Sequence, residues 1–192
     1  WAQRLSYVGE LGFELYIEKK NAKEIYELIV EEGKNHDLSH CGAHAMDTMR
    51  MESGFLHWGH DISPEENQYE AGLNFAISYK KDINFIGKEN LLKIKDKKQN
   101  KKFIMLSLIN NNPGHPLLMH EEPIYLNDKI IGRTTSGNYS FNYNKNLSFG
   151  YVESEYSNKE LSKMNLYIEV AKQKHQAIVE LNPLKDKKAR FL

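Results

Sequence analysis

The second half of the chain carries the clearest pattern of hydrophobic and polar positions. Short apolar runs alternate there with turn residues, and each run is rich in β-branched or aromatic side chains, which is typical of a small β-barrel or β-sandwich. The strands expected on this basis are Phe103–Ile109, Pro123–Leu126, Lys129–Thr135, Leu147–Val152, Leu166–Val170 and Gln176–Leu181. Asn127-Asp128 is a typical hairpin turn between two of them. The pattern therefore predicts an all-β domain at this end of the chain.

The first half shows a helical period in two places. Residues 21–32 predict a helix that buries Ile25, Leu28 and Ile29, with Asn21 as its cap, Glu24 in a capping box and Gly33 as its stop. Residues 42–52 predict a second helix that turns Ala45, Met46 and Met49 inward and ends at Gly54. Core packing is the expected role of both methionines.

The middle of the chain predicts two further helices and a strand. Ser63-Pro64-Glu65-Glu66 has the order of residues that begins a helix, and we expect this helix to end near Gly72. Leu73–Tyr79 alternates apolar and polar residues, which predicts a strand. Phe85–Lys88 then leads into a short helix that reaches Ile94.

A basic run, Lys93–Lys102, separates the two halves. It contains no aromatic residues, so a solvated helix end and linker is preferred over a nucleic-acid patch. We place a domain boundary here, with one domain at 1–96 and a C-terminal β-barrel domain at 97–192. The fold class expected is α+β, with the barrel as its all-β part.

Composition excludes several classes of protein. Lys plus Arg and Asp plus Glu both number 26, so the net charge is zero and nothing favours a nucleic-acid or membrane partner. No apolar run approaches the ~20 residues that span a bilayer. The single cysteine, Cys41, indicates a reducing compartment, and we expect a cytoplasmic location. Because the chain begins at Trp1 without methionine, we expect a fragment of a longer polypeptide.

The stretch Ser6–Leu15 carries the most informative chemistry. Gly9 and Gly12 lie inside a strand-like run, and such glycines mark a bulge, a turn or a close approach to the backbone. Glu10 and Glu14 lie beside them. From spacing alone, a hairpin with an exposed Glu14 is preferred; if Glu14 faces inward, it must accept hydrogen bonds, because burying a bare carboxylate is costly.

Other candidate sites are weaker. His57, His60 and Asp61 are metal-ligand types, but their spacing fits no strong zinc pattern, so a structural loop without metal is preferred. Gly132–Gly137 is polar and glycine-flanked, and no helix pattern follows it to make a phosphate loop. No Ser-His-Asp arrangement or nucleophile elbow is present, so no catalytic residue is assigned.

Two segments resemble a known family. Tyr7–Leu15, Tyr-Val-Gly-Glu-Leu-Gly-Phe-Glu-Leu, resembles the glycine-rich signature of the folate-binding aminomethyltransferases, typified by the T-protein of the glycine cleavage system. Trp58–Leu73 looks most like the C-terminal, folate-binding half of dimethylglycine and sarcosine dehydrogenases. The resemblance implies the C-terminal part of an aminomethyltransferase-like folate-binding domain, followed by the small barrel.

The resemblance also implies which residues bind tetrahydrofolate. Tyr7 and Glu14 match the positions that contact the pterin. Arg50 is similar to an arginine near the folate cavity, although a surface pair with Asp47 is the plainer reading. Phe75 matches a cavity-lining aromatic, although a core phenylalanine is at least as good a reading. The loop Phe55–Ile62 would lie beside the cavity, and the turn at 132–137 would face the other domain.

The implied reaction transfers a one-carbon unit from a methylated amine, such as dimethylglycine or sarcosine, to tetrahydrofolate and gives methylene-tetrahydrofolate. The family's catalytic aspartate precedes the glycine-rich motif, and in the dehydrogenases FAD occupies an upstream domain. Both would belong to upstream domains of the same polypeptide.

Two alternatives stay open. One is a folate-binding or regulatory module without turnover, and the other is a demethylase for a sulfonium substrate of the dimethylsulfoniopropionate type. Gly59–Glu66 favours the dehydrogenases over the regulatory module, because that run looks like the catabolic enzymes.

Overall fold

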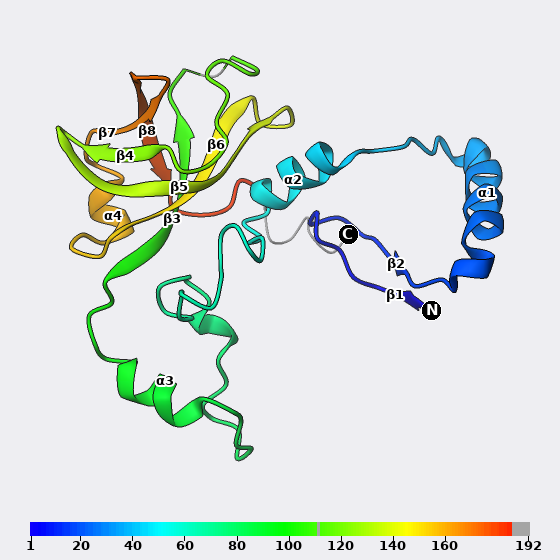
Figure 1. Ribbon diagram of the computed structural model, residues 1–192, viewed down its shortest axis with the longest axis horizontal. Helices are drawn as coiled ribbons and strands as arrows, with labels where there is room; N and C mark the ends of the chain where they lie inside the picture. The colour runs from blue at the N-terminus through cyan, green and yellow to red at the C-terminus, as the bar shows by residue number, and fades with distance from the viewer. Residues whose placement is uncertain (111, 186–192) are drawn as a thin grey trace. The chain divides into compact units, whose positions relative to one another are not determined.

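A computed structural model describes residues 1–110 and 112–185 (Figure 1). The chain forms two compact units. The first comprises Trp1–Phe55 together with Lys185, and the second comprises Leu56–Leu184. No helix in the described ranges is both long and apolar enough to cross a membrane.

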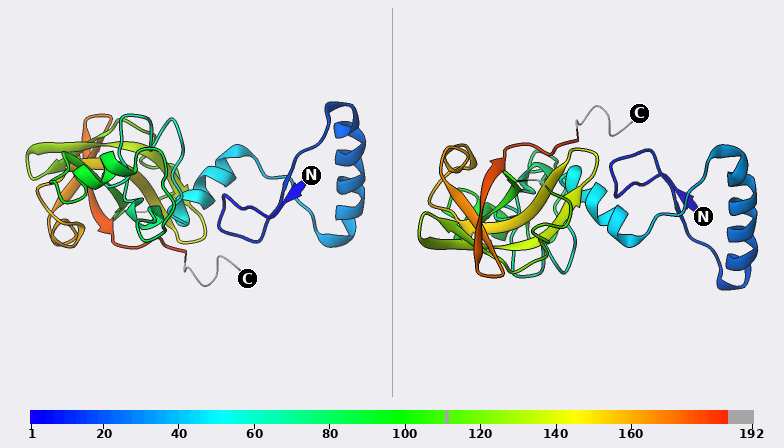
Figure 2. Two further views of the ribbon diagram at one scale, coloured as in Figure 1. Left: turned by 90° about the horizontal axis from the view of Figure 1, so that it is seen from below. Right: turned by 90° about the horizontal axis from the view of Figure 1, so that it is seen from above.

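A closed six-stranded barrel dominates the second unit. Its strands are β3 (Lys101–Leu108), β4 (Pro123–Leu126), β5 (Lys129–Ser140), β6 (Lys145–Glu153), β7 (Leu166–Val170) and β8 (Gln173–Glu180). They pair in the order β3-β6-β5-β4-β7-β8, every pair antiparallel, and β8 closes on β3. Figure 2 shows the closed barrel from two opposite sides. All six predicted strands and the Asn127-Asp128 turn are confirmed.

Alternate residues of the strands fill the barrel. On β3, Ile104, Leu106 and Leu108 belong to the core, as the two-residue period of a strand requires. The short helix α4 (Asn158–Leu161) begins with a capping box between Ser157 and Glu160 and places Leu161 in the same core. The alternation of apolar and polar residues therefore accounts for the apolar part of the barrel interior.

The polar run Gly132–Gly137 is not a turn, so that prediction is wrong. It lies inside β5, where the register with β6 shifts between Thr134 and Ser136. This bulge carries the polar run through the sheet without ending the strand.

The segment that precedes the barrel is mostly turns. Ser63 and Glu66 form the expected cap contacts, because Glu66 accepts hydrogen bonds from the backbone N–H and the hydroxyl of Ser63 at 2.8 and 2.7 Å. However, the described residues 64–72 form turns and irregular chain, with no helix in this stretch. Asn67 Oδ1 accepts from the N–H groups of Tyr69 and Glu70, and such side-chain bonds compete with helix propagation. The predicted helix from Ser63 to Gly72 is therefore wrong.

The predicted strand Leu73–Tyr79 is also absent. The structure has only a turn of 3-10 helix, η3 (Asn74–Ala76), in this stretch. The following helix is confirmed as α3 (Lys88–Ile94), which Gly87 precedes with a φ of 88°.

The first unit contains a short two-stranded sheet and several helical segments. β1 (Ala2–Gln3) pairs antiparallel with β2 (Glu14–Leu15). The helices are η1 (Lys19–Asn21), α1 (Ala22–Gly33), η2 (Lys34–His36) and α2 (Ala43–Glu52). Both predicted helices are confirmed, but Asn21 makes no side-chain cap because η1 continues directly into α1.

The helix ends and buried faces differ from the prediction. Gly54 ends α2 as expected, with a φ of 71°. Gly33 does not act as a left-handed stop: η2 follows it, and Asp37 takes the left-handed conformation instead. The predicted buried stripes are wrong, because Leu28 is 62% exposed and Ile29, Ala45 and Met46 are exposed as well. Periodicity gives the apolar face of a helix but not what covers it.

One lysine side chain has its ammonium nitrogen buried at the end of the barrel strand β3. Lys102 lies on the same face of β3 as Ile104, and its Nζ is buried with no hydrogen-bond partner among the described residues. Burial lowers the pKa of Lys102 against a smaller opposing effect of Glu160. The folded state therefore binds this proton more weakly than the unfolded chain does.

We expect Lys102→Met to stabilise the chain by about 1 kcal/mol near neutral pH, because it removes an unpaired buried ammonium. The gain should shrink as the pH rises towards the ordinary lysine pKa of about 10.4, since the wild type then folds with a neutral amine. Urea unfolding at both ends of this range measures it, with exposed Lys159→Met as the control. A gain that is independent of pH would contradict the explanation.

Candidate functional site

The glycine-rich segment is a bend, not a continuous strand. Only Glu14 and Leu15 of this stretch are in β2, and residues 7–11 are bends. Gly9 has a φ of 69°, and a Cβ built on it would lie 2.1 Å from Ser53 Oγ. Ser53 Oγ donates a hydrogen bond to Val8 O at 3.4 Å. Gly9 therefore permits both the left-handed bend and the close approach of the end of α2.

A hollow of about 330 Å³ lies along this bend, within the range of ligand pockets. Its lining residues are Arg4, Leu5, Ser6, Gly9, Glu10, Leu11, Gly12 and Phe55. Tyr7 stacks on Phe55, with ring centroids 6.3 Å apart and an interplanar angle of 15°. Of these two rings, Phe55 lines the hollow; Tyr7, Glu14 and Arg50 are not among its lining residues.

Glu14 is half-buried beside the bend. Its Oε2 accepts a hydrogen bond from the hydroxyl of Tyr16 at 2.7 Å. That hydrogen bond raises the pKa of Tyr16. Glu10, the other carboxylate, forms an ion pair with Lys185. The exposed-hairpin reading of Glu14 is therefore too simple, since this carboxylate is partly covered and has a donor.

Arg50 is placed by the end of α2. The N–H groups of Gly54 and Phe55 bond to Met51 O and Arg50 O at 3.0 and 2.8 Å, which is a Schellman motif. The Arg50 side chain is 1% exposed; it donates to Asp47 Oδ1 at 2.7 Å and to Phe55 O at 3.1 Å. The predicted pair with Asp47 is present, but it is not a surface pair.

Three of the four predicted site residues belong to the first unit, and Phe75 belongs to the second. Phe55 joins two of them, because Tyr7 stacks on its ring and Arg50 bonds to its carbonyl. The sequence placed Phe55 at the start of a loop beside the cavity but gave this residue no role of its own. The signal was its position directly after Gly54, where a helix that ends in a Schellman motif commonly places an apolar residue.

Phe75 has no core role in this chain. Its side chain is 82% exposed, so the alternative reading as a core phenylalanine is wrong. The cavity-lining role that the resemblance implies stays a prediction.

The loop at 57–61 is fixed to the barrel by Asp61. This buried carboxylate, 1% exposed, accepts hydrogen bonds from Thr135 Oγ1 at 2.5 Å, Ser136 Oγ at 2.8 Å and the N–H of His57 at 2.9 Å. The loop is structural in this respect, and the polar run of β5 supplies its anchor. No group of three or more His, Cys, Asp or Glu in residues 1–110 and 112–185 could hold a metal ion.

Aromatic rings and carboxylates gather around this anchor. The imidazoles of His57 and His60 lie 4.6 Å apart, and His120 lies 6.5 Å from His60. Burial raises the pKa of Tyr151, and the nearby carboxylates of Glu66, Asp61 and Glu70 raise it further. The Tyr151 hydroxyl has no hydrogen-bond partner within the described ranges.

The two halves of the chain match two family descriptions. Residues 1–81 match the GCVT N-terminal domain, and residues 101–186 match the glycine cleavage T-protein C-terminal barrel domain. The closed barrel agrees with the second match. The chain belongs to the glycine cleavage T-protein family.

Curated relatives in this family are enzymes of two kinds. Mitochondrial dimethylglycine dehydrogenase of Homo sapiens is 35% identical over 156 residues, which cover 81% of this chain and 18% of that protein. 4-Methylaminobutanoate oxidase (formaldehyde-forming) of Paenarthrobacter nicotinovorans is 36% identical over 155 residues, with the same two shares. Aminomethyltransferase of Symbiobacterium thermophilum is 34% identical over 154 residues, which cover 80% of this chain and 40% of that protein.

A solved structure supports the fold. The glycine cleavage system aminomethyltransferase T from Bartonella henselae matches 97% of this chain and 50% of its own chain, with a TM-score of 0.81 and 21% identity. The chain thus spans half of this solved relative and between 18% and 40% of the curated relatives described above.

Proposed function

We propose that the chain is the C-terminal part of a tetrahydrofolate-dependent aminomethyl-transfer module in a dimethylglycine or sarcosine dehydrogenase-like protein. The observation that carries the proposal is the hollow along the glycine-rich bend, which Phe55 lines and on whose ring Tyr7 stacks. The dehydrogenase and aminomethyltransferase relatives support the same reading.

The residues of the bend fit a flat, polar heterocycle. A pterin offers adjacent N–H donors, and the Glu14 carboxylate would accept them as a bidentate pair after release of Tyr16. Tyr7 and Phe55 would offer aromatic surface. Arg50 would act as a positioning residue, because it holds Phe55 through the backbone carbonyl.

Bound tetrahydrofolate would supply the nitrogen that accepts the one-carbon unit. The contribution of this chain is to bind and orient that nucleophile, which lowers the entropic part of the barrier. Phe75 is proposed to add a further contact to the cofactor. No residue of this chain is assigned to proton transfer.

The remaining parts of the proposal concern the parent polypeptide, by which we mean the longer protein that contains this chain. We propose that upstream domains carry FAD and the catalytic aspartate, and that the substrate is a methylated amine such as dimethylglycine or sarcosine. The proposed domain boundary at residues 96 and 97 lies between the two family matches. A reducing compartment such as the cytoplasm suits the exposed Cys41.

Glu14→Gln in the parent polypeptide is expected to weaken binding of reduced folate at least about tenfold, because it replaces a charged acceptor pair with one acceptor and one donor. Calorimetric titration with tetrahydrofolate measures the affinity. The matched control is Glu18→Gln, since Glu18 is exposed and its carboxylate forms an ion pair with the exposed Lys20 at 2.8 Å.

Unchanged affinity in Glu14→Gln would remove Glu14 from the site. Loss of affinity in both variants would show that the effect is not specific. An assay of one-carbon transfer to tetrahydrofolate completes the test, because binding without transfer would favour the regulatory module instead.

A further inference from the structure

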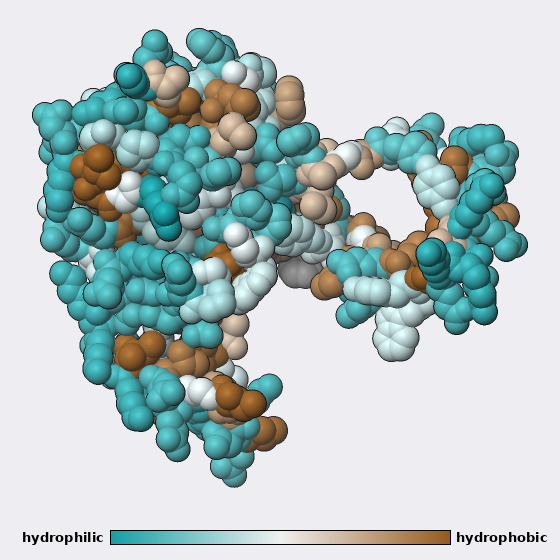
Figure 3. Space-filling view, viewed as in Figure 1, coloured by the Kyte–Doolittle hydropathy of each residue, from teal (hydrophilic) through white to brown (hydrophobic). Residues whose placement is uncertain are grey.

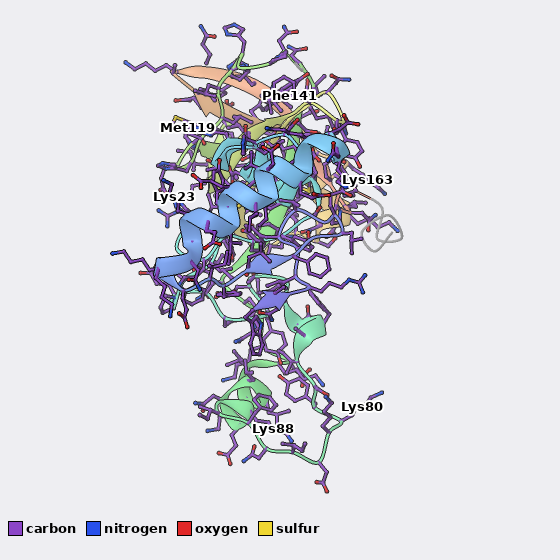
Figure 4. All side chains as sticks on the ribbon, turned by 90° about the vertical axis from the view of Figure 1, so that its right-hand side faces the viewer. Lys23, Lys80, Lys88, Met119, Phe141 and Lys163 are labelled. Carbon is purple, nitrogen blue, oxygen red and sulfur yellow. The ribbon has the colours of Figure 1, made fainter. Side chains whose placement is uncertain are left out.

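The last described residue of the chain lies in the first unit, beside the glycine-rich bend. The second unit ends at Leu184, and the chain returns to the first unit at Lys185. The Lys185 side chain is 10% exposed. Lysines ordinarily keep their ammonium groups in water; Lys23, Lys80 and Lys163, which Figure 4 labels, are exposed in this way. Figure 3 shows such hydrophilic side chains over most of the visible surface. Lys185 is therefore held by specific contacts.

Three contacts hold Lys185 against the bend and the end of α2. Its backbone N–H donates to Glu52 O at 2.9 Å. Glu52 is buried and is the last residue of α2, where carbonyl groups lack a partner within the helix. The stem of the side chain packs on Gly9, because Lys185 Cδ lies 3.4 Å from a Cβ built there. The ammonium forms an ion pair with Glu10 Oε1. Lys185 thus fastens the bend to the helix.

These contacts act on the wall of the hollow, since Gly9 and Glu10 both line it. Gly9 has a left-handed φ of 69°, and glycine populates many conformations, so the bend has no strong geometry of its own. The N–H of Glu10 donates to Ser6 Oγ at 3.2 Å, but this hydrogen bond is exposed to water. The shape of the wall therefore depends on what holds the bend from outside.

We propose that Lys185 is a positioning residue of the hollow, because its ion pair with Glu10 and its stem on Gly9 hold the bend in the conformation that binds the ligand. The proposal rests on the proposed function in one respect, since the ligand meant is reduced folate. Lys185 is not among the lining residues, so it would act through the bend and not by touching the ligand. A bend that is ordered before binding loses less conformational entropy when the ligand arrives.

Lys185→Met in the parent polypeptide removes the charge and keeps an apolar stem on Gly9. It is expected to weaken binding of tetrahydrofolate about tenfold in a calorimetric titration. Lys185→Arg keeps the ion pair and should bind within about threefold of the wild type. The matched control is Lys20→Met, because Lys20 is 76% exposed and pairs with the exposed Glu18. Unchanged affinity in Lys185→Met, or an equal loss in Lys20→Met, would overturn the proposal.

Glu10→Gln tests whether Lys185 acts through Glu10. Either substitution breaks the same ion pair, so the double variant Glu10→Gln with Lys185→Met should bind within about threefold of the weaker single variant. Losses that multiply, to about 100-fold in the double variant, would show that the two residues act independently and would overturn the proposal.

A measurement without folate separates this proposal from the proposed function. In the 192-residue chain, NMR order parameters of the Gly9 and Glu10 amides are expected to fall from about 0.85 in the wild type to below about 0.6 in Lys185→Met. The amides of β8, which is paired on both sides, are the internal reference.

Unchanged order parameters would overturn the role of Lys185, whatever the result for folate. If the wild-type parent polypeptide binds no tetrahydrofolate, the proposed function fails, while a fall in the order parameters still supports the role of Lys185 in ordering the bend.

Discussion

Gly132→Ala is expected to destabilise the barrel by more than about 3 kcal/mol, because a Cβ at this position meets backbone that cannot move aside. Tyr151 O would lie 1.9 Å from it and Val152 Cα 2.8 Å. Both atoms belong to β6, which is paired with β5 on one side and β3 on the other. Relief of the clash would require the two strands to separate. Urea unfolding followed by circular dichroism measures the loss of stability.

The control for this substitution is Gly42→Ala. Gly42 has an ordinary φ of −87°, and no atom of residues 1–110 and 112–185 lies within 4 Å of its built Cβ, so the same chemical change should cost less than about 1 kcal/mol. Comparable losses in the two variants would show that the lost flexibility of glycine, and not the close approach of β6, sets the cost.

The sequence predicts the barrel well for a physical reason. Each barrel strand finds its partners within the same chain, so the two-residue period of β3 or β6 is satisfied where it was read. The prediction fails where the described residues do not satisfy the pattern: Leu73–Tyr79 forms no strand, and Leu28 of α1 is exposed. The local pattern shows which face of a segment is apolar, and tertiary contacts decide whether that face is buried or the segment paired.

In the candidate site, too, residues that belong to a local motif can be recognised from the sequence, whereas residues defined by contacts distant in the sequence cannot. Tyr7 and Glu14 could be proposed from the sequence because a contiguous motif carries them, and Arg50 because of its position on its helix. The role of Phe55 was missed because it depends on a ring contact with Tyr7, 48 positions earlier in the chain. Asp61 was noticed only as a weak metal ligand, since its partners Thr135 and Ser136 are 74 and 75 residues away. Spacing along the chain cannot show a contact between a loop and a strand so distant.

Asp61→Ala is expected to destabilise the second unit by about 3 kcal/mol. It removes a buried acceptor from three donors, the hydroxyls of Thr135 and Ser136 and the N–H of His57, and each buried donor left unpaired costs about 1–3 kcal/mol before relaxation. The midpoint of thermal unfolding should fall by roughly 6–12 °C for a chain of this size. Asp61→Asn should give a smaller loss, because one oxygen still accepts while the amide group faces a donor.

The control is Asp128→Ala, which removes an exposed carboxylate whose ion pair with Lys174 spans 3.3 Å. A surface pair of this kind contributes about 0–1 kcal/mol, so this variant should unfold close to the wild type. If the midpoint of thermal unfolding of Asp61→Ala equals that of Asp128→Ala, the hydroxyls of β5 must find other acceptors when the carboxylate is gone. The loop at 57–61 is then held by its own turns. If the midpoint of Asp61→Ala is well below that of Asp128→Ala, the polar run of β5 holds the loop at 57–61. That role explains why a strand in the barrel carries Thr135 and Ser136 where apolar residues would otherwise pack.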